Sequence, residues 1–142
     1  MNWLPKKSVV VPVDFSEESL AALDVALQMV DRPQQLHVIH VLPELNVAEP
    51  GVIWDSIDDK SRCQHADDAL REKLSDPKYV GLNLHSVVGD AGHKIADYAA
   101  ECKAELIVLP SHGRTGLKRL LIGSVAERVV RLSHCPVLVL RK

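Results

Sequence analysis

Five short apolar or alternating runs, separated by longer stretches with helical spacing, constrain the fold of this 142-residue chain more than any other feature. An alternation of strand and helix is typical of a parallel sheet covered by helices on both faces. The runs at Val9–Val13 and Leu106–Leu109 are apolar throughout, as strands buried on both faces require. The other runs are Leu36–Val41, Leu82–Val88 and Val137–Leu140. The sequence therefore predicts an α/β fold, a doubly wound parallel sheet, and the length fits one domain over residues 1–142.

The stretches between these runs carry helix signals. Apolar residues in Leu20–Val30 share one helical face, and Ser16 before them is a typical N-cap. Similar spacing follows Asp90 and Ser124, and a more polar helix is expected from about residue 55 to residue 74. Residues 43–54 are expected to form a mobile loop, because they contain two prolines, an asparagine and a glycine.

The last run, Val137–Leu140, has charged residues only after it, at Arg141 and Lys142. An apolar edge strand left open would expose unpaired backbone groups, which natural proteins rarely tolerate. We therefore expect this strand either to be internal or to be covered by a second subunit.

Charge and cysteine content exclude several classes of protein. The chain has 17 basic and 19 acidic residues, so its net charge of -2 gives no basic footprint for nucleic acid. No apolar run approaches the ~20 residues that a membrane span needs. Three cysteines without a CxxC pair are typical of a reducing compartment. A cytoplasmic protein without nucleic-acid or membrane partners is expected.

The stretch Pro110–Ser124 is the most informative candidate site. Ligands of open α/β sheets bind beyond the carboxyl ends of the strands, and this stretch follows a buried run. It holds three glycines, three Lys or Arg residues and three hydroxyl residues before a helix start at Gly123. Glycines allow a close backbone approach, and a helix N-terminus attracts anions. Two interpretations stay open: an anion-binding loop, or a glycine-rich turn with solvated charges.

Signatures of other sites are missing. No G-x-G-x-x-G follows the first run, and no glycine directly precedes a lysine. Ser111 and His112 invite a hydrolase interpretation, but Leu109 stands where a nucleophile elbow needs glycine. Adjacent Ser and His are also expected to be poorly placed to share a proton. His37 and His40 should point to opposite faces of their strand, so no metal site is expected.

Asp14 directly follows the first buried run. An acid at this place is either the cap of the following helix or a polar contact for a ligand. The sequence leaves both alternatives open.

The spacing Gly113-x9-Gly123-Ser124, together with Asp14, resembles that of the universal stress protein family. The similarity covers essentially the whole chain, including Val9–Ser16 and Cys135–Val139. The resemblance implies a five-stranded parallel sheet in the order 3-2-1-4-5 and a crevice for ATP or AMP. It also implies a homodimer joined through Val137–Leu140.

The resemblance also implies contacts for the nucleotide. Pro12, Asp14 and Val41 would contact adenine and ribose. The residues that would contact the phosphates are Gly113, Gly123, Ser124 and Val125. Neighbouring candidates in the same motifs are Val13, Pro110, Ser111, His112 and Arg114. Mg²⁺ is a candidate companion of ATP.

Pro110 departs from the family pattern, because the nucleotide motif begins with glycine at this position. Proline has no N–H and a fixed φ, so a hydrogen bond donated there is lost.

The expected function is nevertheless that of a stress-response binding module for an adenine nucleotide. An enzyme is not expected, since no general base or carboxylate pair is evident beside the glycine loop. The alternatives are an interaction scaffold with an empty crevice and a slow ATPase.

Overall fold

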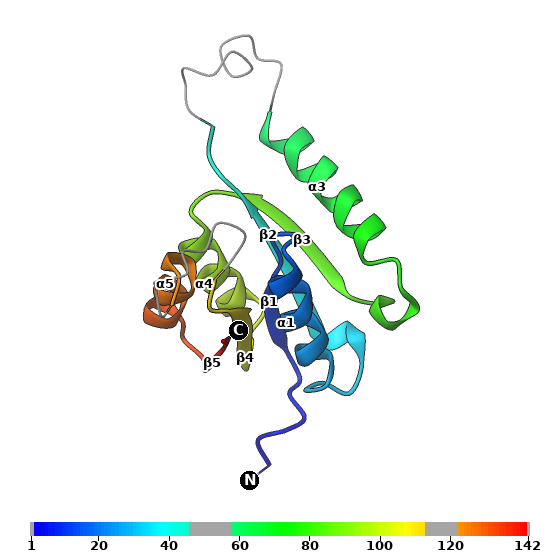
Figure 1. Ribbon diagram of the computed structural model, residues 1–142, viewed down its shortest axis with the longest axis vertical. Coiled ribbons are helices and arrows are strands. Elements are labelled where there is room, and N and C mark those ends of the chain that lie inside the picture. Colours follow the sequence, from blue (N-terminus) through cyan, green and yellow to red (C-terminus); the bar gives the residue numbers. More distant parts are fainter. Residues whose placement is uncertain (1, 46–57, 113–121, 142) are drawn as a thin grey trace.

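The computed structural model describes residues 2–45, 58–112 and 122–141 and contains a five-stranded parallel sheet in the order β3-β2-β1-β4-β5 (Figure 1). The order is the expected one, and each strand lies within one residue of its predicted bounds. The strands are β1 Val9–Pro12, β2 Leu36–Leu42, β3 Asn83–Val88, β4 Leu106–Pro110 and β5 Val137–Leu140.

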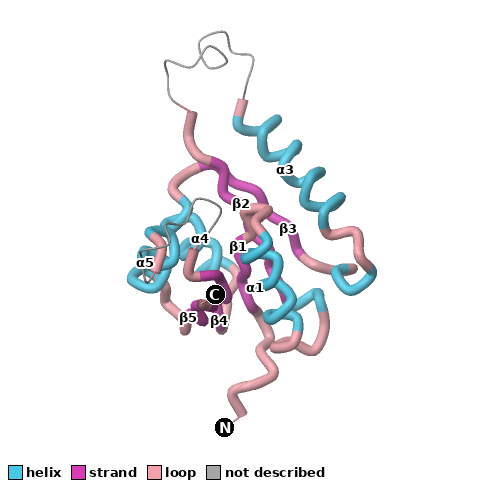
Figure 2. The backbone as a smooth tube through the Cα atoms, in the orientation of Figure 1, coloured by secondary structure: helices cyan, strands magenta, loops and turns pink. Residues whose placement is uncertain are grey.

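Helices cover both faces of the sheet (Figure 2). Helices α1 and α3 pack on one face, where Leu23 and Leu70 join the cluster around Val9. Helices α4 and α5 pack on the other, where Ile95 and Val129 join a second cluster. The helices are α1 Glu17–Leu27, α3 Asp59–Lys73, α4 Ala91–Glu101 and α5 Ser124–Leu132. The 3₁₀ turns Pro33–Gln35 and Pro77–Tyr79 precede β2 and β3.

Polar side chains cap the first turns of three helices. The Ser16 hydroxyl accepts a hydrogen bond from the Ser19 N–H and thereby starts α1, as predicted. Asp90 caps α4 through the His93 N–H, at the start of the helix that the spacing after Asp90 predicted. Asp58 caps α3, so the described helix begins at Asp59, and the predicted start near residue 55 lies outside the described residues. Most of the predicted loop, residues 46–54, also lies outside them.

Helices α4 and α5 meet closely at Gly92. A Cβ on this residue would lie 2.6 Å from the Arg128 Cδ, so only a glycine lets the Arg128 stem cross α4 here. Arg128 Nη1 then donates to the Asp90 carboxylate at 2.6 Å. Hydrogen bonds from His93, together with the Arg128 charge, hold the pKa of Asp90 below its ordinary value. The start of α4 is therefore fastened to α5.

Strand β5 lies at the edge of the sheet, so it is not internal, and its coverage by a second subunit stays a prediction. Its backbone bonds to β4 run from the Ile107 N–H to the Pro136 carbonyl and from the Ser111 N–H to the Leu140 carbonyl. Because amide directions alternate along a strand, Val137 and Val139 direct their N–H groups to the outer side. The described residues place no strand there.

Candidate functional site

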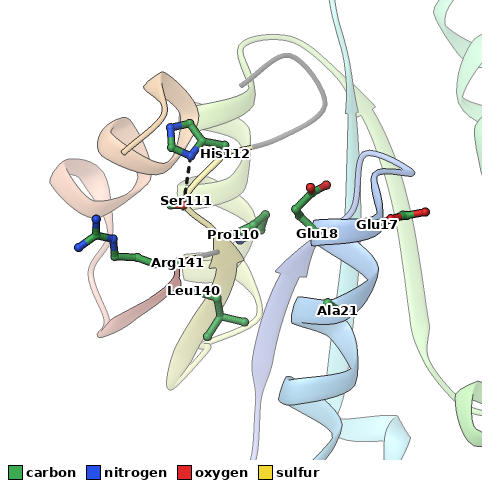
Figure 3. Close-up of a pocket in the computed structure, with 8 residues that line it drawn as sticks. All are labelled: Glu17, Glu18, Ala21, Pro110, Ser111, His112, Leu140 and Arg141. Atoms are coloured by element: carbon green, nitrogen blue, oxygen red, sulfur yellow. Dashed lines mark hydrogen bonds between the residues drawn. The ribbon is translucent and has the colours of Figure 1, made fainter. Parts of the chain in front are cut away.

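The sheet reverses its winding between β1 and β4, and this reversal places a cleft at the carboxyl ends of the strands. After β1 the chain enters α1 on one face, and after β4 it leads to α5 on the other (Figure 1). The last register pair between the two strands is Val10 with Ile107. Beside the opened ends lies a cleft of about 300 Å³ (Figure 3). Its lining is Glu17, Glu18, Ala21, Pro110, Ser111, His112, Leu140 and Arg141.

The turn from β1 into α1 is a closed hydrogen-bond network. The Asp14 carboxylate accepts from both the N–H and the hydroxyl of Ser16. The Ser19 hydroxyl accepts from the Asp14 N–H and donates to the Ser16 carbonyl at 2.9 Å. Ser16 is therefore the cap of α1, and Asp14 fixes the orientation of that cap. Asp14 is therefore not itself the cap of α1 but supports it. The other alternative, that Asp14 contacts a ligand, stays a prediction.

Phe15, between Asp14 and Ser16, has a positive φ of 66°. A bulky residue in this left-handed region is a genuine outlier and is found mainly where surrounding contacts enforce it. The Phe15 ring packs edge-on against His40, with ring centroids 5.0 Å apart. His40 in turn donates from Nδ1 to the Val13 carbonyl at 2.7 Å. These contacts bind the end of β1 to β2 and hold the turn beside the cleft.

Ser111 and His112 lie in a bend after β4. Their side chains meet, with the Ser111 Oγ 3.2 Å from the His112 Nδ1, so the prediction that they are poorly placed to share a proton is wrong. In an extended strand, the side chains of two adjacent residues point to opposite faces, but in this bend those of Ser111 and His112 point toward each other. The Ser111 residue is only 5% exposed, which leaves little of its hydroxyl accessible to a substrate. The Nε2 of His112 is buried and has no hydrogen-bond partner among the described residues.

The N-cap residue of helix α5 is Gly123, which has no side chain to cap the helix. Among the described residues no side chain caps its first turn, unlike those of α1, α3 and α4. The Gly123 N–H is used internally, since it donates to the Ser111 carbonyl at 2.6 Å. The N–H groups of Ser124 and Val125 follow in the helix's first turn, where α-helices have no internal acceptors. This turn can accept an anionic group.

The structure gathers some predicted site residues and separates others. Pro110, Ser111 and His112 line the cleft. Pro12, Val13 and Asp14 lie at the end of β1, with Val13 buried on the α1 face. Val41 packs on the opposite, α4 face of the sheet, and Gly123, Ser124 and Val125 start the helix on that face. Gly113 and Arg114 lie outside the described residues.

Five lining residues of the cleft were not predicted: Glu17, Glu18, Ala21, Leu140 and Arg141. Glu17 and Glu18 have an ordinary local role in the first turn of α1, where acids favour the helix dipole. Leu140 and Arg141 end β5, so the rule that ligands bind at carboxyl strand ends was the signal that could have found them. Figure 3 shows Pro110 pointing toward α1, whereas Arg141 extends away from it.

Within residues 2–45, 58–112 and 122–141, no three His, Cys, Asp or Glu side chains are grouped as metal ligands would be. His37 and His40 do lie on opposite faces, since His37 contacts Tyr98 of α4 and His40 contacts Phe15. None of the helices in those residues has the length and apolar character to cross a membrane.

The sequence model of the universal stress protein family matches residues 6–141, nearly the whole chain. The chain belongs to the universal stress protein family. Universal stress protein MJ0531 of Methanocaldococcus jannaschii is 33% identical over 142 residues, covering 96% of this chain and 82% of the relative. The solved structure of protein MJ0577 from the same organism is similar with a TM-score of 0.75 and 27% identity over 98% of both chains.

A universal stress protein solved in complex with cAMP is also similar to this family member. It has a TM-score of 0.60 and 25% identity, and the match covers 96% of this chain and 97% of the other. The resemblance seen in the sequence is thus confirmed, and so are the α/β fold and its strand order.

Proposed function

We propose that this universal stress protein is a binding module that holds an adenine nucleotide, such as AMP or ATP, at the reversal point between β1 and β4. The observation that carries the proposal is the start of α5, where the N-cap residue is Gly123 and no described side chain caps the first turn. A phosphate group can take the place of that cap, because it accepts hydrogen bonds from first-turn N–H groups.

The surroundings of α5 support the same ligand class. The cleft beside the ends of β1 and β4 has a mainly apolar floor at Pro110, Ala21 and Leu140, suited to a flat base or a sugar. A relative of the same fold was solved with cAMP, which is an adenine nucleotide. Mg²⁺ would accompany ATP, and the described residues contain no group of three His, Cys, Asp or Glu side chains that could bind it directly.

We also propose a homodimer joined by the outer edge of β5. The four residues of β5 are partly exposed, and the outward N–H groups of Val137 and Val139 have an apolar neighbourhood. Pairing with a second β5 would satisfy these groups and cover the edge. We keep the expectation of a cytoplasmic protein as part of this proposal, since Cys63, Cys102 and Cys135 are all free thiols.

The nucleotide proposal is tested by what purified protein carries and binds. Protein purified without added nucleotide is heat-denatured, and the supernatant is analysed by chromatography for adenine nucleotides. Calorimetric titration with AMP and ATP then measures the affinity. Bound nucleotide, or saturable binding without turnover, supports a binding module. No release and no binding would favour the interaction scaffold, and release of inorganic phosphate from ATP would favour the slow ATPase.

A further inference from the structure

The turn between β1 and α1 holds a bulky residue in an unfavourable backbone conformation. The φ of Phe15 is 66°, in the left-handed region that glycine adopts freely. Other residues are disfavoured there because the Cβ crowds the following carbonyl oxygen, by a factor of roughly 5 to 30 in the conformational equilibrium. Contacts with the surrounding structure must therefore hold Phe15 in place, and enforced outliers of this kind cluster at functional sites.

The last residue of β1's extension, Val13, is fastened to β2 through both of its backbone polar groups. The Val13 N–H donates to the Ile39 carbonyl at 2.9 Å, as in a continuing parallel ladder. The Val13 carbonyl accepts from a side chain, the Nδ1–H of His40, at 2.7 Å. Because Val13 is also buried in the cluster on the α1 face, the turn starts from a fixed point.

The same imidazole contacts the strained residue directly. The rings of His40 and Phe15 have centroids 5.0 Å apart and planes inclined by 72°, an edge-to-face arrangement that aromatic rings favour. His40 is itself held in the sheet, where it lies in register with Ser86 of β3. We call its two contacts, with the Val13 carbonyl and with the Phe15 ring, the His40 latch. The latch fixes the turn at the strained residue and just before it.

The turn held by the His40 latch leads directly into one wall of the cleft. Ser16 caps α1 and is bonded to the Asp14 carboxylate, so the cap and the end of the turn form one unit. The α1 residues that line the cleft are Glu17, Glu18 and Ala21 (Figure 3). Since φ and ψ are the soft dihedrals of the backbone, a change of φ at Phe15 would reorient α1's first turn relative to β1.

We propose that His40 is a positioning residue of the nucleotide site, because its latch keeps Phe15 left-handed and thereby presets the wall that the turn and α1 present to the ligand. The inference rests on the proposed function and deepens it. Without the latch, the turn relaxes to a favourable φ, and binding has to restore the left-handed one. The apparent affinity then falls in proportion to the fraction of molecules that stay competent to bind.

The test is a double-mutant cycle in AMP affinity, measured by calorimetry on variants whose folding is checked by thermal denaturation. His40→Leu removes both contacts of the latch and should weaken AMP binding by about five- to tenfold, within the range set by the strain. Phe15→Gly adopts the left-handed φ without steric cost, so it should retain AMP binding to within about twofold. Adding His40→Leu to Phe15→Gly should then weaken binding by less than about twofold.

Two further variants complete the design. His85→Leu is the matched control for replacing a histidine on a strand, since His85 stacks on Tyr98 of α4 on the other face of the sheet, and it should leave the affinity unchanged. His40→Asn keeps a side-chain N–H donor for the Val13 carbonyl and lacks the ring. It replaces His40→Leu in the cycle if that variant fails to fold, and its loss of about two- to fivefold should also disappear in Phe15→Gly.

The outcomes separate this proposal from the proposed function. A loss of affinity from the folded His40 variant that is equal with Phe15 and with glycine at residue 15, or no loss at all, would overturn the positioning role alone. Loss of AMP binding in Phe15→Gly by itself would also overturn it, because a left-handed backbone would then not be sufficient. An unmodified protein that binds neither AMP nor ATP overturns the proposed function as well.

Discussion

The Gly123 N–H donates to the Ser111 carbonyl at 2.6 Å, and a Cβ on residue 123 would lie 2.8 Å from that same oxygen. This contact joins the end of β4 to the start of α5 across the segment that contains the glycine loop. It leaves no room for a side chain, because the nearest atom is backbone and cannot rotate away.

Gly123→Ala is expected to lower the free energy of unfolding by about 1–3 kcal/mol, the usual cost of forcing extra volume into a packed place. AMP binding should weaken at least tenfold, since the first turn of α5 must move. Urea denaturation and calorimetric titration measure the two effects. Ser124→Ala is the matched control: it keeps the backbone N–H and should weaken binding by only about two- to tenfold. Equal affinities for Gly123→Ala and the unmodified protein would place the phosphate elsewhere.

Asp14 can be tested for its two roles separately. Asp14→Asn retains an oxygen for the Ser16 N–H and hydroxyl, so the cap of α1 should survive, while the charge is lost. We expect a small change in melting temperature and a loss of about 1.5–3 kcal/mol in nucleotide binding if the carboxylate accepts from the ribose. Asp14→Ala should additionally destabilise the fold by about 1 kcal/mol through the weakened cap. Unchanged nucleotide affinity in Asp14→Asn would mean that Asp14 has a structural role alone.

The homodimer can be tested at two adjacent residues of β5, because the N–H of Val139 faces the outer edge and the N–H of Leu138 faces β4. Val139→Pro removes an outward N–H and leaves the bonds from β4 to the Pro136 and Leu140 carbonyls in place. This variant should be folded but monomeric in light scattering at tens of micromolar, where the unmodified protein is a dimer. Leu138→Pro removes an N–H that faces β4 and should lower the melting temperature instead. A monomeric unmodified protein would refute the dimer.

Half-buried His37 should make the stability pH-dependent. Burial lowers its pKa below the ordinary value, because the folded state disfavours the charged imidazole. The unfolded chain then binds more protons, so the stabilisation is complete above the unfolded pKa of about 6.5 and decreases as the pH falls toward the lowered folded pKa. Urea denaturation between about pH 7.5 and 5.5 measures this slope.

His37→Gln is expected to reduce that slope, and His65→Gln on the exposed side of α3 serves as the control for replacing a histidine. An identical slope in His37→Gln and the unmodified protein would contradict the assignment to His37.

Local patterns in the sequence predicted the elements of this fold well. The strands Val9–Pro12 and Leu106–Pro110 follow from uninterrupted apolar runs, and the Ser16 cap was predictable because a cap depends on residues within one turn. The order of the strands came from family resemblance. Which strands lie at the two edges of the sheet, and which helix covers which face, depends on contacts between residues far apart in the chain.

The sequence by itself determined that β1 and β4 carry prolines near their carboxyl ends and that a glycine precedes α5. Only the tertiary structure decided that the pairing of β1 with β4 ends at Val10 and Ile107, before either proline, and that the Gly123 N–H donates to the Ser111 carbonyl. It also brought Glu17 and Glu18 into one cleft with Pro110. The physical reason is that a backbone amide's direction follows from the strand's pairing partner, and pairing between distant segments is set by the packing of the whole sheet.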